Sequence, residues 1–186
     1  MKILILYGTT EGQTRKIAGF LAKHLTDHLH EPLLVEAGEV PANLDLHGFG
    51  AILVAASLHL GRFQPSVVHF VKQHVALIDA KPNAFIAVSL AVLSDDPEDA
   101  QGLDHCVETF MHETNWSPGR IHHEAGAFLY TTYDFFKRWA MKYIAYRRGA
   151  PSDTSRDYEF TDWTGLAEFA DDFAAAAARP ALESGT

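Results

Sequence analysis

Short apolar runs alternate along the chain with longer stretches in which apolar residues recur every three or four positions. The runs lie at residues 3–7, 33–35, 51–56, 84–90 and 121–128, and each predicts a β-strand. The amphipathic stretches predict helices at residues 14–28, 67–78, 98–113 and 164–177, the last with Asp162 as its N-cap. Runs that are apolar at nearly every position indicate strands buried on both faces, as in a parallel sheet covered by helices.

The order of these elements predicts an α/β fold with a doubly wound, five-stranded parallel sheet in the order 2-1-3-4-5. We expect one domain over residues 1–178 and a frayed tail over residues 179–186. One connection does not fit a minimal domain, because residues 129–163 separate the fifth strand from the last helix. Connections of this kind usually have ~2–6 residues, so the insertion is a candidate for function.

Charge and cysteine content narrow the functional classes. The formal net charge of −9 disfavours a general nucleic-acid-binding or anionic-membrane-binding protein, although the charge is not evenly distributed along the chain. Cys106 is the only cysteine, so an internal disulfide is excluded and a reducing, cytoplasmic setting is favoured. We find no apolar stretch of the ~18–20 residues that a membrane-spanning helix needs. These features leave the oligomeric state open.

The loop after the first predicted strand has the features of a phosphate-binding site. Hydroxyl donors, a glycine and the start of a helix converge there, and the positive end of the helix dipole favours an anion. The candidate ligands in this loop are Thr9, Thr10, Glu11, Gly12, Gln13 and Thr14. Neither a Walker lysine nor the G-x-G-x-x-G dinucleotide pattern is present, which leaves a phosphate monoester as the best fit.

Two further loops follow predicted strands at the same edge of the sheet, where doubly wound folds bind ligands. Their candidate cofactor ligands are Ser57, Leu58, His59, Gly61, Ser89, Leu90 and Ala91. Together with the Thr-x-x-Gly-x-Thr loop, these segments resemble the phosphate loop and the two isoalloxazine loops of flavodoxins. The resemblance implies a flavodoxin-like fold with FMN as the cofactor.

The whole chain, insertion included, resembles the menaquinone-dependent protoporphyrinogen oxidase family. The segments that carry the resemblance are residues 12–15, 70–74, 125–127 and 158–163. It implies FMN-dependent oxidation of protoporphyrinogen IX to protoporphyrin IX in heme biosynthesis, with menaquinone or ubiquinone as electron acceptor. A flavodoxin-type electron carrier and an NAD(P)H:quinone reductase are the alternatives. No residue is assigned as a catalytic base.

One segment departs from the family pattern. Residues 94–99 read Ser-Asp-Asp-Pro-Glu-Asp, whereas the loop after the fourth strand tends to be basic in the family. A porphyrinogen carries two propionates, so an acidic rim beside the flavin would repel it.

The insertion is basic and aromatic in an otherwise acidic protein. Residues 128–148 hold eight aromatic residues and five basic residues against one acidic residue, a net charge of +4. Such a segment rests on an anionic membrane surface, holds an anionic substrate, or simply packs on the domain. The first option places the protein at the cytoplasmic face of the inner membrane. The candidate contact residues are Tyr133, Phe136, Lys137, Arg138, Trp139, Lys142, Tyr143, Arg147 and Arg148.

Histidines offer weaker signals. His24 and His28 are one helical turn apart and His122 and His123 are adjacent, but no third ligand is evident for either pair, so we predict no metal site.

Overall fold

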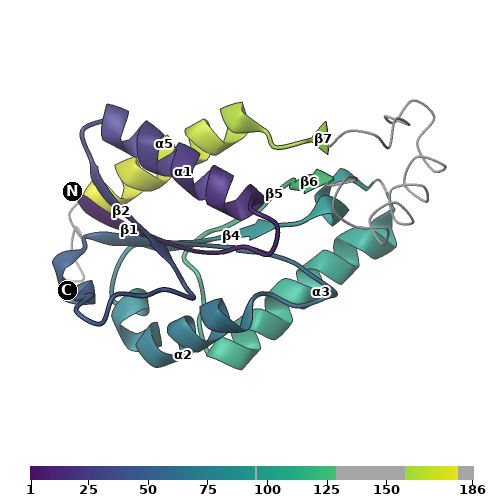
Figure 1. Ribbon diagram of the computed structural model, residues 1–186, viewed down its shortest axis with the longest axis horizontal. Coiled ribbons are helices and arrows are strands. Elements are labelled where there is room, and N and C mark those ends of the chain that lie inside the picture. The colour runs from purple at the N-terminus through teal and green to yellow at the C-terminus, as the bar shows by residue number, and fades with distance from the viewer. Residues whose placement is uncertain (95, 129–157, 180–186) are drawn as a thin grey trace, which may run out of the picture.

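The computed structural model describes residues 1–94, 96–128 and 158–179, and its ribbon is drawn in Figure 1. Strands and helices alternate along the chain. In order they are β1 (Lys2–Gly8), α1 (Gln13–Asp27), β2 (Glu31–Glu36), the 3₁₀ turn η1 (Leu46–Gly48), β3 (Ala51–Ser57), α2 (Pro65–Asp79), β4 (Asn83–Val88), η2 (Leu90–Leu93), α3 (Pro97–Thr114), β5 (Ile121–Glu124), β6 (Ala127–Phe128), β7 (Tyr158–Glu159) and α5 (Trp163–Ala178).

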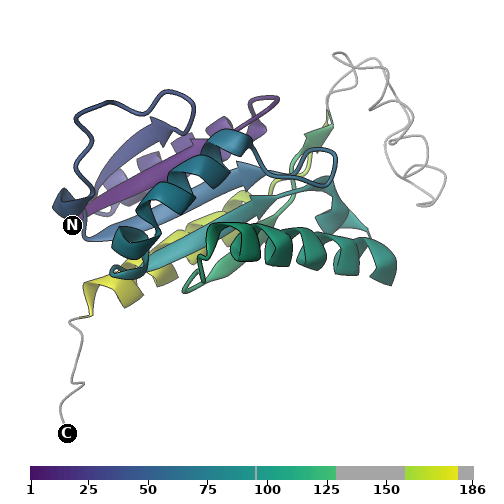
Figure 2. The same cartoon turned by 90° about the horizontal axis from the view of Figure 1, so that it is seen from below.

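The main sheet has the predicted order, β2-β1-β3-β4-β5, and all four strand pairs are parallel. Figure 1 shows α1 and α5 covering one face of the sheet, and α2 and α3 covering the other. Figure 2, turned by 90°, shows α2 and α3 side by side across that second face. The flavodoxin-like, doubly wound architecture is therefore confirmed.

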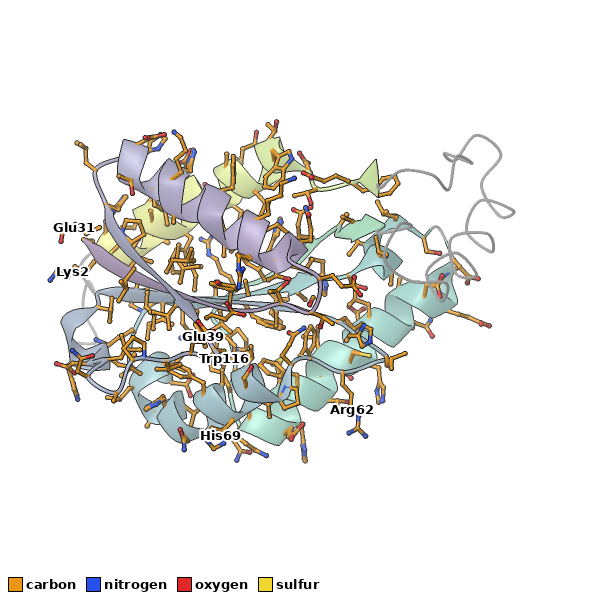
Figure 3. All side chains as sticks on the ribbon, in the orientation of Figure 1. Lys2, Glu31, Glu39, Arg62, His69 and Trp116 are labelled. Carbon is orange, nitrogen blue, oxygen red and sulfur yellow. The ribbon has the colours of Figure 1, made fainter. Side chains whose placement is uncertain are left out.

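Each face of the sheet has its own apolar core. Ile17, Leu21, Leu166 and Phe173 pack against the face covered by α1 and α5. Phe63, Phe85, Phe110 and Trp116 form an aromatic cluster on the other face, and Figure 3 shows Trp116 between the sheet and α2. The central strands are buried on both sides, which explains why their sequences are apolar at nearly every position.

The predicted fifth strand was too long. Residues 121–128 do not form one strand, because β5 ends at Glu124 and β6 pairs instead with β7 in an antiparallel ribbon. The buried Glu124 side chain causes the break: its Oε1 accepts hydrogen bonds from Ala125 N and Asp162 N, both at 2.9 Å. The apolar residues 125–128 thus gave no sign in the sequence that β5 pairs with β4 whereas β6 pairs with β7.

Other predicted boundaries shift by at most two residues. The fourth strand ends at Val88 rather than at residue 90, since Ser89 caps the turn η2 by accepting from Ala91 N. Asp162 is confirmed as the N-cap of α5, where Oδ1 accepts from Thr164 N and Gly165 N.

Within the described residues, no helix combines the length and the apolar character that a membrane span requires. Residues 129–157, which make up most of the predicted insertion, and residues 180–186 of the predicted tail lie outside the described part of the chain.

Candidate functional site

A cavity of about 300 Å³ opens at the carboxyl-terminal edge of the sheet. It collects loops that are far apart in sequence, and it brings together twelve of the thirteen predicted cofactor ligands; Gly12 is the one that does not line it. The predicted residues that line the cavity are Thr9, Thr10, Glu11, Gln13, Thr14, Ser57, Leu58, His59, Gly61, Ser89, Leu90 and Ala91. Sequence analysis missed Leu60, Val88, Gly126 and Ala127, which also line it.

The start of α1 is arranged to receive an anion. Gly12 is the N-cap at φ +92°, a conformation that favours glycine, and no side chain caps the first turn. The first turn holds no acidic residue. Thr14 is fully buried, and its Oγ1 has no hydrogen-bond partner among the described residues. Because buried polar groups are nearly always paired, free N–H groups and an unpaired hydroxyl at one helix end fit a phosphate.

Gln64 joins two of the loops that line the cavity, and sequence analysis did not identify it. Its Nε2 donates to Thr10 Oγ1 at 3.0 Å and to Ser57 Oγ at 2.6 Å. Its Oε1 is buried without a partner in the described structure. No motif marks this glutamine, because its role depends on the spatial approach of the β1–α1 and β3–α2 loops.

A tight turn after β3 presents apolar surface to the cavity. His59 and Arg62 exchange backbone hydrogen bonds of 2.9 and 3.1 Å, and the two residues between them, Leu60 and Gly61, both have positive φ. Leu60 is 75% exposed although it lines the cavity. An apolar side chain held out by a strained turn is suited to lie against a flat ring.

Gly126 and Ala127 line the cavity on another side, and the described end of the insertion, residues 158–163, is bonded to the loops there. Gln13 Nε2 donates to Thr161 Oγ1 at 2.8 Å, and that hydroxyl donates to the Ala125 carbonyl at 2.9 Å. Lys16 forms an ion pair with Glu159 on β7. The insertion therefore leaves and re-enters the domain beside the cavity. Sequence analysis had named residues 125–127 and 158–163 only as carriers of the family resemblance.

Glu11 is the carboxylate within the cavity lining. Burial raises the pKa of its carboxyl, against an opposing effect of the nearby His59 ring. Its Oε1 is buried and has no hydrogen-bond partner in the described structure. A side chain in this state favours its neutral form more than an exposed glutamate does.

The described acidic residues of segment 94–99 do not line the cavity. Asp96 is the N-cap of α3 and accepts from Glu98 N at 2.9 Å, while Glu98 and Asp99 lie in the first turn. Carboxylates at these positions stabilise a helix N-terminus. Among the described acidic residues of this segment, none lines the cavity. Asp96, Glu98 and Asp99 therefore have a structural role at the start of α3, and the effect of segment 94–99 on an anionic substrate stays a prediction from sequence.

A second hollow, of about 660 Å³, lies between α2 and α3 and shares Gly61 with the first. Arg62, His69 and Lys72 line it, and Lys72 is within 3.3 Å of Glu113. Figure 3 shows Arg62 and His69 directed away from the sheet on this side of the molecule. Positively charged side chains thus lie next to the cavity, on the side away from α1.

The structure places a carboxylate beside the first histidine pair that spacing along the chain did not reveal. Asp171, on α5, places its Oδ1 2.8 Å from His24 Nε2 and 3.9 Å from His28 Nε2. Packing of α1 against α5 creates this proximity, which spacing along the chain cannot reveal. His122 instead contacts the buried Glu124 at 3.2 Å, and His123 lies 3.8 Å from Asp104.

The nine predicted contact residues of the insertion, from Tyr133 to Arg148, lie outside the described residues. Their role stays a prediction from sequence.

Solved structures agree on the fold. The chain superposes on a short-chain flavodoxin associated with a bacterial microcompartment with a TM-score of 0.56 and 14% identity, over 96% of this chain and 99% of the other. A flavodoxin of Streptococcus pneumoniae TIGR4 gives a TM-score of 0.57 and 16% identity, over 95% and 99% of the two chains.

Sequence comparisons extend further than the fold. Residues 4–155 match the flavodoxin domain family, whose members bind a flavin. The chain is 32% identical to a protoporphyrinogen IX dehydrogenase [quinone] of Leishmania major, over 94% of this chain and 75% of that protein. It is 28% identical to the Escherichia coli K12 protein of the same name, over 98% and 100%. The chain therefore belongs to the flavodoxin domain family and, within it, to the quinone-linked protoporphyrinogen IX dehydrogenases.

Proposed function

We propose that this protein binds FMN in the cavity at the carboxyl edge of the sheet and oxidises protoporphyrinogen IX to protoporphyrin IX, with a quinone as electron acceptor. The observation that carries the proposal is the match along nearly the whole chain to dehydrogenases of that name, insertion included. The two flavodoxins compared above share the fold at only 14% and 16% identity.

The structure supports a flavin with a single terminal phosphate. The first turn of α1 and the Thr14 hydroxyl provide donors for one phosphate group, and the G-x-G-x-x-G pattern that would suit a pyrophosphate is absent. Leu58, Leu60 and Leu90 provide apolar surface farther along the cavity. These residues fit FMN, and they would exclude water from one side of its ring.

The chemistry that bound FMN supplies is the two-electron oxidation of the substrate. The protein's part is to hold and orient the cofactor and to bring the porphyrinogen to the open side of the cavity. Arg62, in the adjoining hollow, is placed to attract a propionate carboxylate. Among the described acidic residues of segment 94–99, Asp96, Glu98 and Asp99 lie at the start of α3 and not in the cavity lining.

We also propose that the insertion brings the enzyme to a membrane that contains its quinone. Its net charge of +4 and eight aromatic residues over residues 128–148 support this role. Basic residues near an anionic surface contribute ~1 kcal/mol each. Sedimentation with vesicles of phosphatidylglycerol should capture the protein at low salt, and replacement of Arg147 and Arg148 by glutamate should release it. Binding that is independent of these charges would refute the contact.

The decisive experiment is anaerobic mixing of the flavin-loaded protein with protoporphyrinogen IX, with flavin absorbance and porphyrin fluorescence recorded together. We expect flavin bleaching with the same time course as porphyrin formation, and recovery of the absorbance when a menaquinone or ubiquinone analogue is added. Flavin that dithionite reduces but porphyrinogen does not would instead identify an electron carrier. Bleaching by NAD(P)H would identify a reductase. Acid release and chromatography of the flavin distinguish FMN from FAD.

A further inference from the structure

A cluster of histidine and aspartate lies on the face of the molecule formed by α1 and α5. His24 and His28 belong to α1, and Asp171 belongs to α5. Each side chain offers one ligand atom, and the three atoms lie within 4.8 Å of one another. None of the three side chains is used in the flavin site, since none lines the cavity.

The two histidines are side by side because they are four residues apart on one helix. Their ring centroids are 4.3 Å apart. The His24 ring also stacks on Phe20, which packs against Trp163 of α5. His24 is thus held by aromatic neighbours, with 17% of its side chain exposed, whereas the His28 and Asp171 side chains are about half exposed. The site is partly ordered by packing and open to solvent.

Hydrogen bonding sets the tautomer of His28. Its Nδ1 lies 2.8 Å from the backbone carbonyl of His24. A carbonyl oxygen can only accept, so Nδ1 carries the proton and Nε2 of the neutral ring keeps its lone pair. That Nε2 atom faces Asp171 Oδ1. An imidazole whose other nitrogen donates to a carbonyl is the usual arrangement of a metal-binding histidine.

The distances suit a small ion. Zinc binds imidazole nitrogen and carboxylate oxygen at ~2.0–2.2 Å, so tetrahedral ligand atoms lie about 3.4 Å apart. The separations from Asp171 Oδ1, 2.8 Å to His24 and 3.9 Å to His28, lie on either side of that value. The 2.8 Å contact is a hydrogen bond from His24 Nε2 to the carboxylate, so a bound ion would take its place and the proton of the neutral His24 ring would lie on Nδ1.

We propose that His24, His28 and Asp171 bind a Zn²⁺ ion that links α1 to α5, with water at the fourth position. Two imidazoles and one carboxylate select late first-row metals such as zinc and disfavour Mg²⁺ and Ca²⁺, which need more oxygen ligands. Because the ion binds the packed helices and not the unfolded chain, it stabilises the folded protein. The link joins the helix that starts at the phosphate loop to the helix that follows the insertion.

Calorimetric titration of the full-length, flavin-loaded protein with ZnCl₂ tests the proposal. We expect one zinc ion per chain and no binding of Mg²⁺. Mutation of a residue that is hydrogen-bonded to a metal ligand typically lowers metal affinity ~10–100-fold. Loss of a ligand itself should therefore weaken zinc binding at least about tenfold. H28Q and D171N should both show this loss. H112Q is the matched control, because it removes an exposed histidine of α3 far from the cluster and should bind zinc as the wild type does.

A spectroscopic readout locates the ion among the eleven histidines. Cu²⁺ bound at this site should show hyperfine coupling to two imidazole nitrogens in electron paramagnetic resonance, and to one in H28Q. Zinc should also raise the melting temperature of the wild type but not of D171N. If H28Q and D171N bind zinc with wild-type affinity, or if Cu²⁺ in the wild type couples to the same nitrogens as in H28Q, the proposal is wrong.

Discussion

The N-termini of α1 and α5 lie on the same face of the sheet but differ in their capping. At α5, Asp162 Oδ1 accepts from Thr164 N at 3.1 Å and from Gly165 N at 3.0 Å. At α1, the N-cap is Gly12, and no side chain accepts a hydrogen bond from the backbone N–H groups of the first turn. Both helices leave four backbone N–H groups without a helical partner. One end is closed by the chain itself, and the other stays open for a ligand.

The closed end also supports the open one. Glu124 Oε1 accepts from Asp162 N, and Thr161 joins the Ala125 carbonyl to Gln13 in the phosphate loop. The start of α5 is thereby fixed to the end of β5 and to the cavity wall. The two helix ends therefore belong to one arrangement. The Asp162 carboxylate satisfies the N-terminus of α5, whereas the N-terminus of α1 is left to an anion from outside the chain.

The largest effect should come from removal of the carboxylate that holds the closed end. Glu124→Ala leaves Ala125 N and Asp162 N buried without their acceptor, at a cost of ~1–3 kcal/mol for each group. We expect a loss of about 3 kcal/mol in the free energy of unfolding, measured by urea denaturation of the apoprotein. Glu124→Gln keeps an acceptor oxygen at this position and should retain most of the stability. Equal losses in the two variants would show that the two hydrogen bonds do not carry the effect.

At the open end, Thr14→Val should weaken FMN binding while it leaves the apoprotein as stable as before or more so. The hydroxyl is buried and unpaired in the described structure, so its replacement by a methyl group removes a desolvated polar group. A hydrogen bond to a charged group contributes ~1.5–3 kcal/mol, which corresponds to roughly 10–100-fold in affinity. Quenching of FMN fluorescence measures the affinity, and thermal unfolding measures the stability.

Thr14→Ser is the matched control, since it keeps the hydroxyl and should bind FMN within a few-fold of the wild type. A Thr14→Val variant that binds FMN normally would show that this hydroxyl does not contact the phosphate. It would also remove the main functional distinction between the two helix ends.

The open end was easier to predict from sequence than the closed one. The phosphate loop is local, because Thr9, Gly12 and Thr14 lie within six residues between a strand and a helix. The apolar runs likewise predicted the strand order, since burial on both faces leaves few topologies. Asp162 was identified as an N-cap because that role is also local.

Contacts between distant segments could not be predicted. Gln64 joins two loops across 54 residues, and Asp171 meets His24 across 147 residues. The apolar residues after Glu124 suggested a continuous strand, whereas a buried carboxylate ends it. Periodicity reports which faces are buried, and it does not report which polar side chain meets which backbone group.

A smaller effect should follow from removal of the α5 cap itself. Asp162→Ala eliminates both side-chain hydrogen bonds at the helix start, and loss of an N-cap costs ~1 kcal/mol. We expect a decrease of about that size in the free energy of unfolding by urea. Asp162→Asn preserves an acceptor oxygen and should cost only a few tenths of that. A cap mutant with unchanged stability would mean that water replaces the carboxylate, and the two helix ends would then differ less than their hydrogen bonds suggest.

The smallest effect concerns charge beside the open end. Burial raises the pKa of Glu11, so the folded protein holds this proton more tightly than the unfolded chain does. Ionisation of Glu11 therefore costs stability in the folded state, and this cost declines as the pH falls through the raised pKa and is gone only below the ordinary pKa. Glu11→Gln should make the apoprotein modestly more stable than the wild type at pH 7.5, and the difference should shrink at pH 4.5.

Urea denaturation at the two pH values measures the Glu11 difference, and Glu108→Gln, at an exposed position of α3, controls for the loss of one negative charge from an acidic protein. A gain at pH 7.5 that is specific to Glu11→Gln would show that the apoprotein carries an unfavourable carboxylate in its cofactor cavity. The same gain in both variants would assign it to the overall charge of −9 instead. If the gain is specific to Glu11→Gln, the loop at the start of α1 lowers the stability of the apoprotein, as expected of residues that serve ligand binding and not folding.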